Sequence, residues 1–195
     1  MAKELEIEFK NMLTATEYQE LINLYSDKNA THIVQTNYYF DTPNQDLKQK
    51  KMGLRIREKS LPHELTLKVP TTDQHALVEV TDHLTEQEKN DFLNKMIFPT
   101  NSHVREVLLE NGIQIDTIER IGELSTDRLE STQHLPHLIV IDKSTFYGHI
   151  DYELEMETND SRTGEVFFKN FLKEHHIPER PADKKIARML FYKEK

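Results

Sequence analysis

Charged and apolar residues alternate strictly near the start of the chain. Residues 4–10 read Glu-Leu-Glu-Ile-Glu-Phe-Lys. Successive side chains of a β-strand point to opposite faces, so a strand here carries its acids and Lys10 on one face and apolar side chains on the other. The same period of two recurs around Ile56, between Glu64 and Lys68, and around Leu154. These stretches predict strands that each have one ionised face and one apolar face.

Signals for helix ends separate these strands. Thr14 and Glu17 have the spacing of a capping box, as do Thr85 and Glu88. The pattern predicts strands at 4–10, 32–41, 53–59, 64–69, 76–84, 118–129, 138–144 and 148–157, and helices at 14–25, 85–96, 102–111, 163–175 and 181–192, with Pro181 in the first turn of the last. Two runs of antiparallel strands with helices between and after them indicate an α+β fold. Periodicity alone leaves an open sheet and a closed barrel as alternatives.

The composition limits the classes of function. The chain has 195 residues, 36% of them hydrophobic, and no Pro-, Gly- or Ser-rich linker, so we predict a single domain over residues 1–195. Its 25 Lys and Arg residues against 34 Asp and Glu give a net charge of -9. This charge argues against binding to nucleic acid or to an anionic membrane, because those partners need a positive excess. The absence of cysteine excludes disulfides and thiolate metal ligands.

The sequence also carries an expectation about location. It begins directly with the charged strand and lacks the apolar core of a secretory signal, and no later apolar run is long enough to cross a bilayer. We therefore expect a soluble, cytoplasmic protein. The sequence leaves the oligomeric state open.

The charged faces have two chemical interpretations. Carboxylates two residues apart on a strand lie about 6 to 7 Å apart, close enough to share one hard cation such as magnesium. Clustered arginines and lysines repel each other unless an anion of high charge density lies among them, and guanidinium groups suit phosphate oxygens. The two together indicate a metal and polyphosphate site. A cross-strand ladder of salt bridges on a wet sheet face explains the same residues equally well.

Other phosphate-binding signals are weak. The sequence has only five glycines and no glycine-rich phosphate loop, and its ten histidines are scattered without metal-ligand spacing. Lys185 and Arg188 fall on one face of the predicted last helix. That face is either solvated or placed to cap an anion site.

Read in order, the charged motifs resemble those of the CYTH superfamily, the triphosphate tunnel metalloenzymes. This superfamily includes class IV adenylyl cyclases, thiamine triphosphatases and bacterial inorganic triphosphatases. The signature is E-x-E-x-K, which is Glu6-Ile7-Glu8-Phe9-Lys10 in this chain. The supporting motifs span nearly the whole sequence and are Tyr38-Tyr39-Phe40-Asp41-Thr42, Leu54-Arg55-Ile56-Arg57, Leu65-Thr66-Leu67-Lys68, Thr126-Asp127-Arg128, Asp142, Tyr152-Glu153-Leu154-Glu155 and Lys185-Ile186-Ala187-Arg188. The chain is most similar to the small, single-domain bacterial branch.

The resemblance implies a closed antiparallel barrel of eight strands, with the charged faces turned into a tunnel and flanking helices over the apolar outer faces. It implies one or two magnesium or manganese ions held by Glu6, Glu8, Glu153 and Glu155, with Asp142 near the metals. Because Glu157 keeps the phase of its strand, it is a further candidate ligand. The implied triphosphate-binding residues are Lys10, Arg55, Arg57, Lys68, Arg128 and Lys185, and Arg188 is added as their neighbour on the last helix; Glu6, Glu8, Lys10 and Asp142 are the implied catalytic residues.

The resemblance leaves three functions open. The expected function is metal-dependent hydrolysis of a triphosphate compound, most simply inorganic tripolyphosphate, with release of orthophosphate. Hydrolysis is favoured because no segment stands out as an adenine pocket. The first alternative is a class IV adenylyl cyclase that converts ATP to cyclic AMP and pyrophosphate. The second is a polyphosphate- or nucleotide-binding module without turnover, which the complete acidic motifs argue against because carboxylates beside phosphates need a metal.

Overall fold

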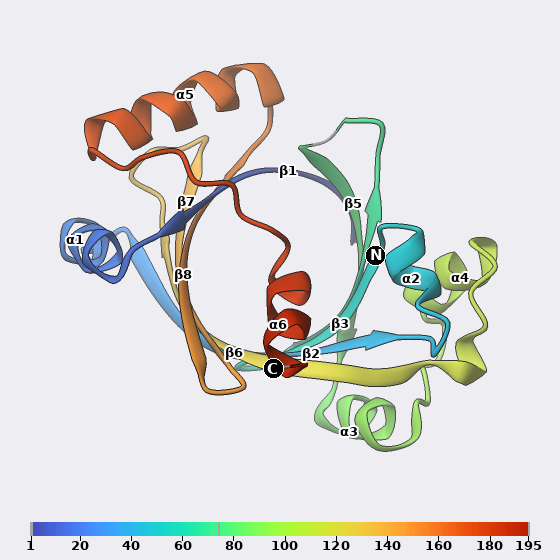
Figure 1. Ribbon diagram of the computed structural model, residues 1–195. Coiled ribbons are helices and arrows are strands. Elements are labelled where there is room, and N and C mark those ends of the chain that lie inside the picture. The colour runs from blue at the N-terminus through green and yellow to red at the C-terminus, as the bar shows by residue number, and fades with distance from the viewer. Residues whose placement is uncertain (1, 74, 195) are drawn as a thin grey trace. The chain divides into compact units, whose positions relative to one another are not determined.

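The computed structural model describes residues 2–73 and 75–194, and its eight strands form a closed antiparallel barrel (Figure 1). The strand order around the barrel is β1-β5-β4-β3-β2-β6-β7-β8. This confirms the expected closed eight-stranded barrel and decides against an open sheet. The strands are β1 (Ala2–Leu13), β2 (Ala30–Asp41), β3 (Gly53–Glu58), β4 (His63–Pro70), β5 (Ala76–Leu84), β6 (Glu119–Ser131), β7 (Leu138–Phe146) and β8 (His149–Thr158).

Six α-helices and one short 3-10 helix flank the strands in the described residues. The capping boxes predicted at Thr14 and Thr85 are both formed, and Gly112 follows the fourth helix with a positive φ of 71°. None of these helices is long and apolar enough to cross a membrane. The helices are α1 (Ala15–Tyr25), α2 (Asp46–Gln49), α3 (Glu86–Lys95), α4 (His103–Glu110), η1 (Ile115–Thr117), α5 (Ser161–Glu174) and α6 (Lys185–Lys193).

The chain divides into two compact units that are interleaved along the sequence. The first unit contains 36–124 and the start of β1 as far as Leu5, and the second contains 6–35 and the chain from Ser125 onward. The expectation of a single domain stays a prediction.

The first unit packs its apolar strand faces under α2, α3 and α4 (Figure 1). Leu54, Ile56 and Leu65 alternate with charged residues along β3 and β4, and all three are fully buried. Phe92 of α3 and Leu108 of α4 are buried in the same cluster. The period of two in the sequence therefore separates a dry helix-covered face from a charged face, as the alternation predicts.

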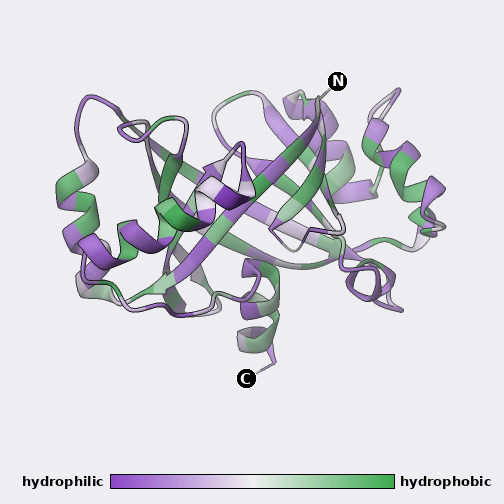
Figure 2. Cartoon of the chain, turned by 90° about the horizontal axis from the view of Figure 1, so that it is seen from above, coloured by the Kyte–Doolittle hydropathy of each residue, from purple (hydrophilic) through white to green (hydrophobic). Residues whose placement is uncertain are grey.

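The second unit uses α1 and α5 in the same way. Phe9 of β1 and Met156 of β8 are buried, and Phe168 of α5 packs against Phe9 in a tilted arrangement with ring centroids 5.8 Å apart. A Cβ added at Gly164 would meet Thr158 Cγ2 at 2.6 Å, so α5 approaches the strands at a position where only glycine fits. Figure 2 shows hydrophilic and hydrophobic segments side by side along the helices, as expected where one helix face packs and the other meets solvent.

The segment before α6 is held along β1. The backbone N–H of Met12 donates to the carbonyl of Arg180 at 3.0 Å, and the Arg180 N–H donates to Asn11 Oδ1 at 2.6 Å. Arg180 also makes two hydrogen bonds to Glu17, at 2.8 and 2.9 Å. The expectation that the last helix begins at Pro181 is wrong, because Arg180 is tied to β1 and the chain turns helical only at Lys185.

Candidate active site

The register of β1 and β8 places the signature residues on one face of the second unit. Glu8 lies opposite Glu157, and Lys10 lies opposite Glu155. Directly opposed residues of an antiparallel pair project from the same face. The Lys10 ammonium is 2.9 Å from Glu155 Oε1 and 3.1 Å from Glu8 Oε1. The alternation read from the sequence therefore joins distant parts of the chain on one charged face.

The same face extends over β6 and β7. Arg128 lies opposite Asp142, which lies opposite Glu153 on β8. Arg128 donates to both carboxylate oxygens of Asp142, Nε to Oδ1 at 2.9 Å and an Nη to Oδ2 at 2.7 Å. The same nitrogen donates to Glu155 Oε2 at 2.9 Å. This bidentate pair fixes the guanidinium plane between two acids.

Three of these acids form a cluster with the geometry of a cation site. Asp142, Glu153 and Glu155 each offer an oxygen within 4.8 Å of the others. Asp142 and Glu153 are fully buried, and Glu155 is 4% exposed. Buried carboxylates must be paired with cations, and an all-oxygen donor set suits a hard divalent ion. The residues present therefore fit the metal that the sequence motifs imply. We name Asp142, Glu153 and Glu155 the acid triad.

Helix α6 brings two cations to the acid triad. Lys185 Nζ is 2.8 Å from Asp142 Oδ2, 2.5 Å from Glu153 Oε2 and 2.7 Å from Glu155 Oε1. Arg188 donates to Glu153 Oε2 at 2.9 Å and to Asp151 Oδ2 at 2.7 Å. The first turns of α6 thus face the acids, not solvent.

Burial and opposite charges act against each other on these pKa values, and the charges dominate. Burial alone lowers the pKa of Lys10, but the carboxylates of Glu155, Glu8 and Glu153 hold it well above its usual range. Burial alone raises the pKa of Glu155, but Lys10, Lys185 and Arg128 hold it well below its usual range. The pKa of Asp142 is lowered against burial by Arg128 and Lys185. These groups are therefore ionised together at neutral pH.

The first unit carries a second charged face, with a different balance. Arg57 lies opposite Glu64, and Lys68 lies opposite Glu79. Arg55 and Lys68 both contact Glu79 Oε1, at 3.1 and 3.3 Å. Arg57 donates from Nε to Asn37 Oδ1 at 3.3 Å, and its Nη1 is 3.7 Å from Glu64. We name Arg55, Arg57 and Lys68, which project from one face of β3 and β4, the basic group.

A scan against family models matches residues 4–190 to the CYTH domain. The chain belongs to the CYTH domain family. "Putative triphosphatase YjbK" of Bacillus subtilis (strain 168) is 36% identical over 195 residues, covering 100% of this chain and 98% of that protein. A crystal structure from Bacillus halodurans, described as a "putative adenylate cyclase", is 33% identical with a TM-score of 0.89, covering 96% of this chain and 98% of that one.

A more distant CYTH-fold match is a protein from Hippeastrum, "Putative adenylyl cyclase HpAC1". It is 23% identical, with a TM-score of 0.80, and the match covers 95% of this chain and 94% of that one. Its structure is reported to reveal a dominant triphosphatase activity in that protein. At this identity the likeness supports the fold of our chain.

The predicted site residues of this CYTH chain divide between the two units. Glu8, Lys10, Arg128, Asp142, Glu153, Glu155, Lys185 and Arg188 come together in the second unit, and Arg55, Arg57 and Lys68 in the first. Glu6 and Glu157 are half-buried and lie outside the acid triad. Between Glu153, Glu155 and Glu157, the first two are therefore the acids that share the triad with Asp142.

Sequence reasoning missed two acids of these faces. Glu79 accepts from Arg55 and Lys68 in the basic group, and its pKa is lowered against burial by Arg55, Lys68 and Arg57. Asp151 pairs with Arg188. The signal available in the sequence was the alternation of each strand. Val78 and Val80 flank Glu79, and Asp151 keeps the two-residue phase of Glu153 and Glu155.

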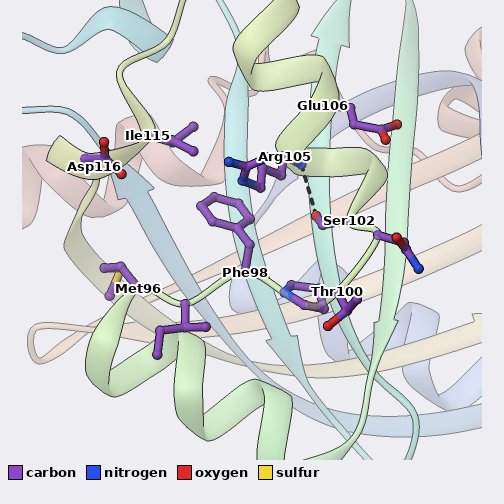
Figure 3. Close-up of a pocket in the computed structure, with 11 residues that line it drawn as sticks. Met96, Phe98, Thr100, Ser102, Arg105, Glu106, Ile115 and Asp116 are labelled. Carbon is purple, nitrogen blue, oxygen red and sulfur yellow. Dashed lines mark hydrogen bonds between the residues drawn. The ribbon is translucent and has the colours of Figure 1, made fainter.

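A separate hollow lies between the end of α3 and the start of α4. Its volume is about 500 Å³, and it is lined by residues 96–102, 105, 106, 115 and 116. Figure 3 shows Arg105 beside Phe98 and Ile115. The dashed line there is the hydrogen bond that the backbone N–H of Arg105 donates to Ser102 Oγ at 3.0 Å. None of the predicted site residues lines this hollow.

Proposed function

We propose that this chain is a metal-dependent triphosphatase. The observation that carries this proposal is the acid triad, three buried carboxylates within 4.8 Å of one another and surrounded by Lys10, Arg128 and Lys185. A purely structural salt-bridge ladder lies on a wet sheet face, whereas these acids are at most 4% exposed. Ionised groups this deeply buried are typical of sites that bind charged ligands. The similarity to the Bacillus subtilis relative supports the same assignment.

Glu153 and Glu155 are the residues that we expect to hold the metal, with Asp142 beside them. A bound divalent ion would supply positive charge against the developing charge of the phosphoryl group and would lower the pKa of a bound water. Arg128 holds Asp142 through two hydrogen bonds, and Arg188 holds Glu153 through two. The roles of Glu6, Glu8 and Glu157 as further ligands stay predictions.

The cations are proposed to bind phosphate oxygens. Arg55, Arg57 and Lys68 present three positive charges on neighbouring strands, and such a group favours an anion of high charge density. Lys10, Arg128, Lys185 and Arg188 are proposed to do the same beside the acid triad. Groups already fixed by their strands and by ion pairs can orient a phosphoryl chain without large rearrangement, which favours in-line attack.

The proposed reaction is hydrolysis at the terminal phosphorus. The oxygen of water forms a bond to that phosphorus, and the bond to the bridging oxygen breaks. The electron pair stays on the departing diphosphate, and the proton of the attacking water passes to solvent. The products are orthophosphate and the diphosphate. Inorganic tripolyphosphate is the proposed substrate, magnesium or manganese the proposed metal, and the cytoplasm the proposed location.

Adenylyl cyclase activity is the second candidate, and the similarity to the Bacillus halodurans structure favours it. A cyclase reaction needs the ribose 3'-hydroxyl to attack the α phosphorus, with pyrophosphate as the leaving group. The same cations and acids serve both reactions, so the choice depends on which end of the substrate the protein recognises. No segment of the sequence stands out as an adenine pocket.

The deciding experiment measures orthophosphate release from tripolyphosphate, ATP and thiamine triphosphate, each with magnesium and with manganese. Cyclic AMP and pyrophosphate are assayed in the same samples. Orthophosphate from tripolyphosphate without cyclic product supports the proposal, whereas cyclic AMP from ATP assigns the chain to the cyclases. Tripolyphosphate binding that needs no metal, without any product, indicates a binding module.

A further inference from the structure

Lys185 occupies the centre of the acid triad. Its ammonium lies within 2.8 Å of one oxygen from each of the three acids, Asp142, Glu153 and Glu155. The side chain of Lys185 is 12% exposed, and two of the acids are fully buried. An ammonium has three hydrogens to donate and here it has three carboxylates as partners. Lys185 therefore pairs its single positive charge with all three residues that fit a metal.

A metal bound to the same three oxygens would lie within about 5 Å of this ammonium nitrogen. Magnesium requires oxygen distances of about 2.1 Å, so with nitrogen–oxygen distances of at most 2.8 Å the ion and the nitrogen could be no more than about 4.9 Å apart. Water is largely excluded at this depth, so the repulsion between a single and a double positive charge is poorly screened. The two cations therefore compete for these oxygens.

We propose that Lys185 is a positioning residue that competes with the divalent metal for the acid triad, so that metal binding displaces its ammonium. Lys185 then acts through the carboxylates, because it holds them together and neutralises them until the metal takes its place. This inference concerns the regulation of the proposed triphosphatase site. Only the role of Lys185 in turnover rests on that proposed function.

The remaining anchors of α6 allow Lys185 to move while the helix stays. Met189 is fully buried, Arg188 keeps Asp151 as a partner, and Tyr192 stacks on His149 with ring centroids 3.7 Å apart. The ammonium of a lysine sits on a flexible four-carbon stem, so it can leave the acids by rotation of the side chain while the helix stays folded. The displaced ammonium becomes available to a phosphate oxygen, which orders the events as metal first and triphosphate second.

The test is a manganese titration in the absence of any triphosphate, with free Mn²⁺ followed by electron paramagnetic resonance. Lys185→Met removes the competing charge and keeps an unbranched side chain. We expect Mn²⁺ to bind Lys185→Met about tenfold more tightly than the wild type, because the ion no longer has to displace a buried cation. Lys193→Met is the matched control, since Lys193 is an exposed residue of the same helix. Its Mn²⁺ affinity should equal that of the wild type.

Equal or weaker Mn²⁺ binding by folded Lys185→Met overturns the proposal, as does absence of Mn²⁺ binding in every variant. If Lys185→Met does not fold, a titration of the wild-type protein tests the displacement of Lys185 directly. The ammonium signal of Lys185 is followed by nitrogen-15 NMR during titration with diamagnetic Mg²⁺, and an unmoved signal at saturation contradicts displacement. These measurements need no turnover, so their failure is distinct from failure to hydrolyse tripolyphosphate.

Discussion

The two charged faces of this protein use the same residue types in different proportions and at different depths. In the first unit the basic group carries three cations beside Glu79 and Glu64, and its charged side chains keep 14 to 23% of their surface exposed. In the second unit the acid triad is at most 5% exposed by side chain, and its cations are held by two or more carboxylates. The first balance favours an anion that still meets solvent, and the second favours a cation in a dry site. Identical strand periodicity therefore yields two different electrostatic environments.

The largest effect is expected from Glu153→Gln in the acid triad. It removes one metal-binding charge with little change in volume and deprives Lys185 and Arg188 of a partner. We expect phosphate release to fall by about a thousandfold. Glu165→Gln, in an exposed pair with Lys169 on α5, is the control and should keep wild-type activity. Activity near that of the wild type in Glu153→Gln would remove Glu153 from the metal site.

The next effect concerns folding, not turnover. Arg128→Met leaves Asp142 fully buried without its bidentate partner. We expect the free energy of unfolding to fall by about 3 to 5 kcal/mol, the usual cost of an uncompensated buried charge. Urea denaturation monitored by circular dichroism measures it. A loss below about 1 kcal/mol would show that Lys185 alone neutralises Asp142, and would weaken the contrast between the two faces.

The basic group should respond in the opposite way. Arg57→Ala removes a half-buried cation whose charged partner, Glu64, keeps 16% of its side chain exposed. We expect triphosphate binding to weaken by about 2 to 4 kcal/mol, and the free energy of unfolding to change by less than about 1 kcal/mol. Isothermal titration calorimetry with tripolyphosphate measures the affinity. If stability fell while affinity held, the basic group would be structural.

The smallest effect is a pH dependence of stability within the basic group. The pKa of Glu79 is lowered from 4.5 because Arg55, Lys68 and Arg57 outweigh burial. A lowered pKa stabilises the fold above the unfolded value, and this contribution is lost as the pH falls through the folded value. The stability difference between wild type and Glu79→Gln should therefore narrow from about pH 6 to about pH 3. A difference that stays constant over this range would contradict the ion pairing of Glu79.

The strands were the part of the fold most open to prediction from sequence. Glu153 and Glu155 lie on one face with Leu154 on the other, as the alternation requires, and β5 has the predicted bounds. Closure of the barrel could not be derived from periodicity, because it depends on pairing between strands distant in sequence, such as β1 with β8. The resemblance supplied that step.

Part of the site lay beyond sequence reasoning for a physical reason. The pattern of α6 identifies Lys185 as a residue of a polar face, but nothing local says that this face meets three acids. Helix α3 gives a similar case. Its sequence is almost wholly polar, yet Lys89 is 4% exposed and paired with Glu58 at 2.5 Å and Glu86 at 2.8 Å. Glu58 is distant from Lys89 in sequence, so the local pattern of α3 could not predict that this lysine is buried.

The position of α6 after β7 and β8 has a consequence for biosynthesis. Ribosomes deliver Asp142, Glu153 and Glu155 before Lys185 and Arg188. Until α6 emerges, burying these acids leaves them with Lys10 and Arg128 as their cations, which is unfavourable in a dry site. A nascent chain that ends before α6 should therefore keep the carboxylates of β7 and β8 hydrated or protonated. The second unit should complete its folding only when its last helix leaves the exit tunnel.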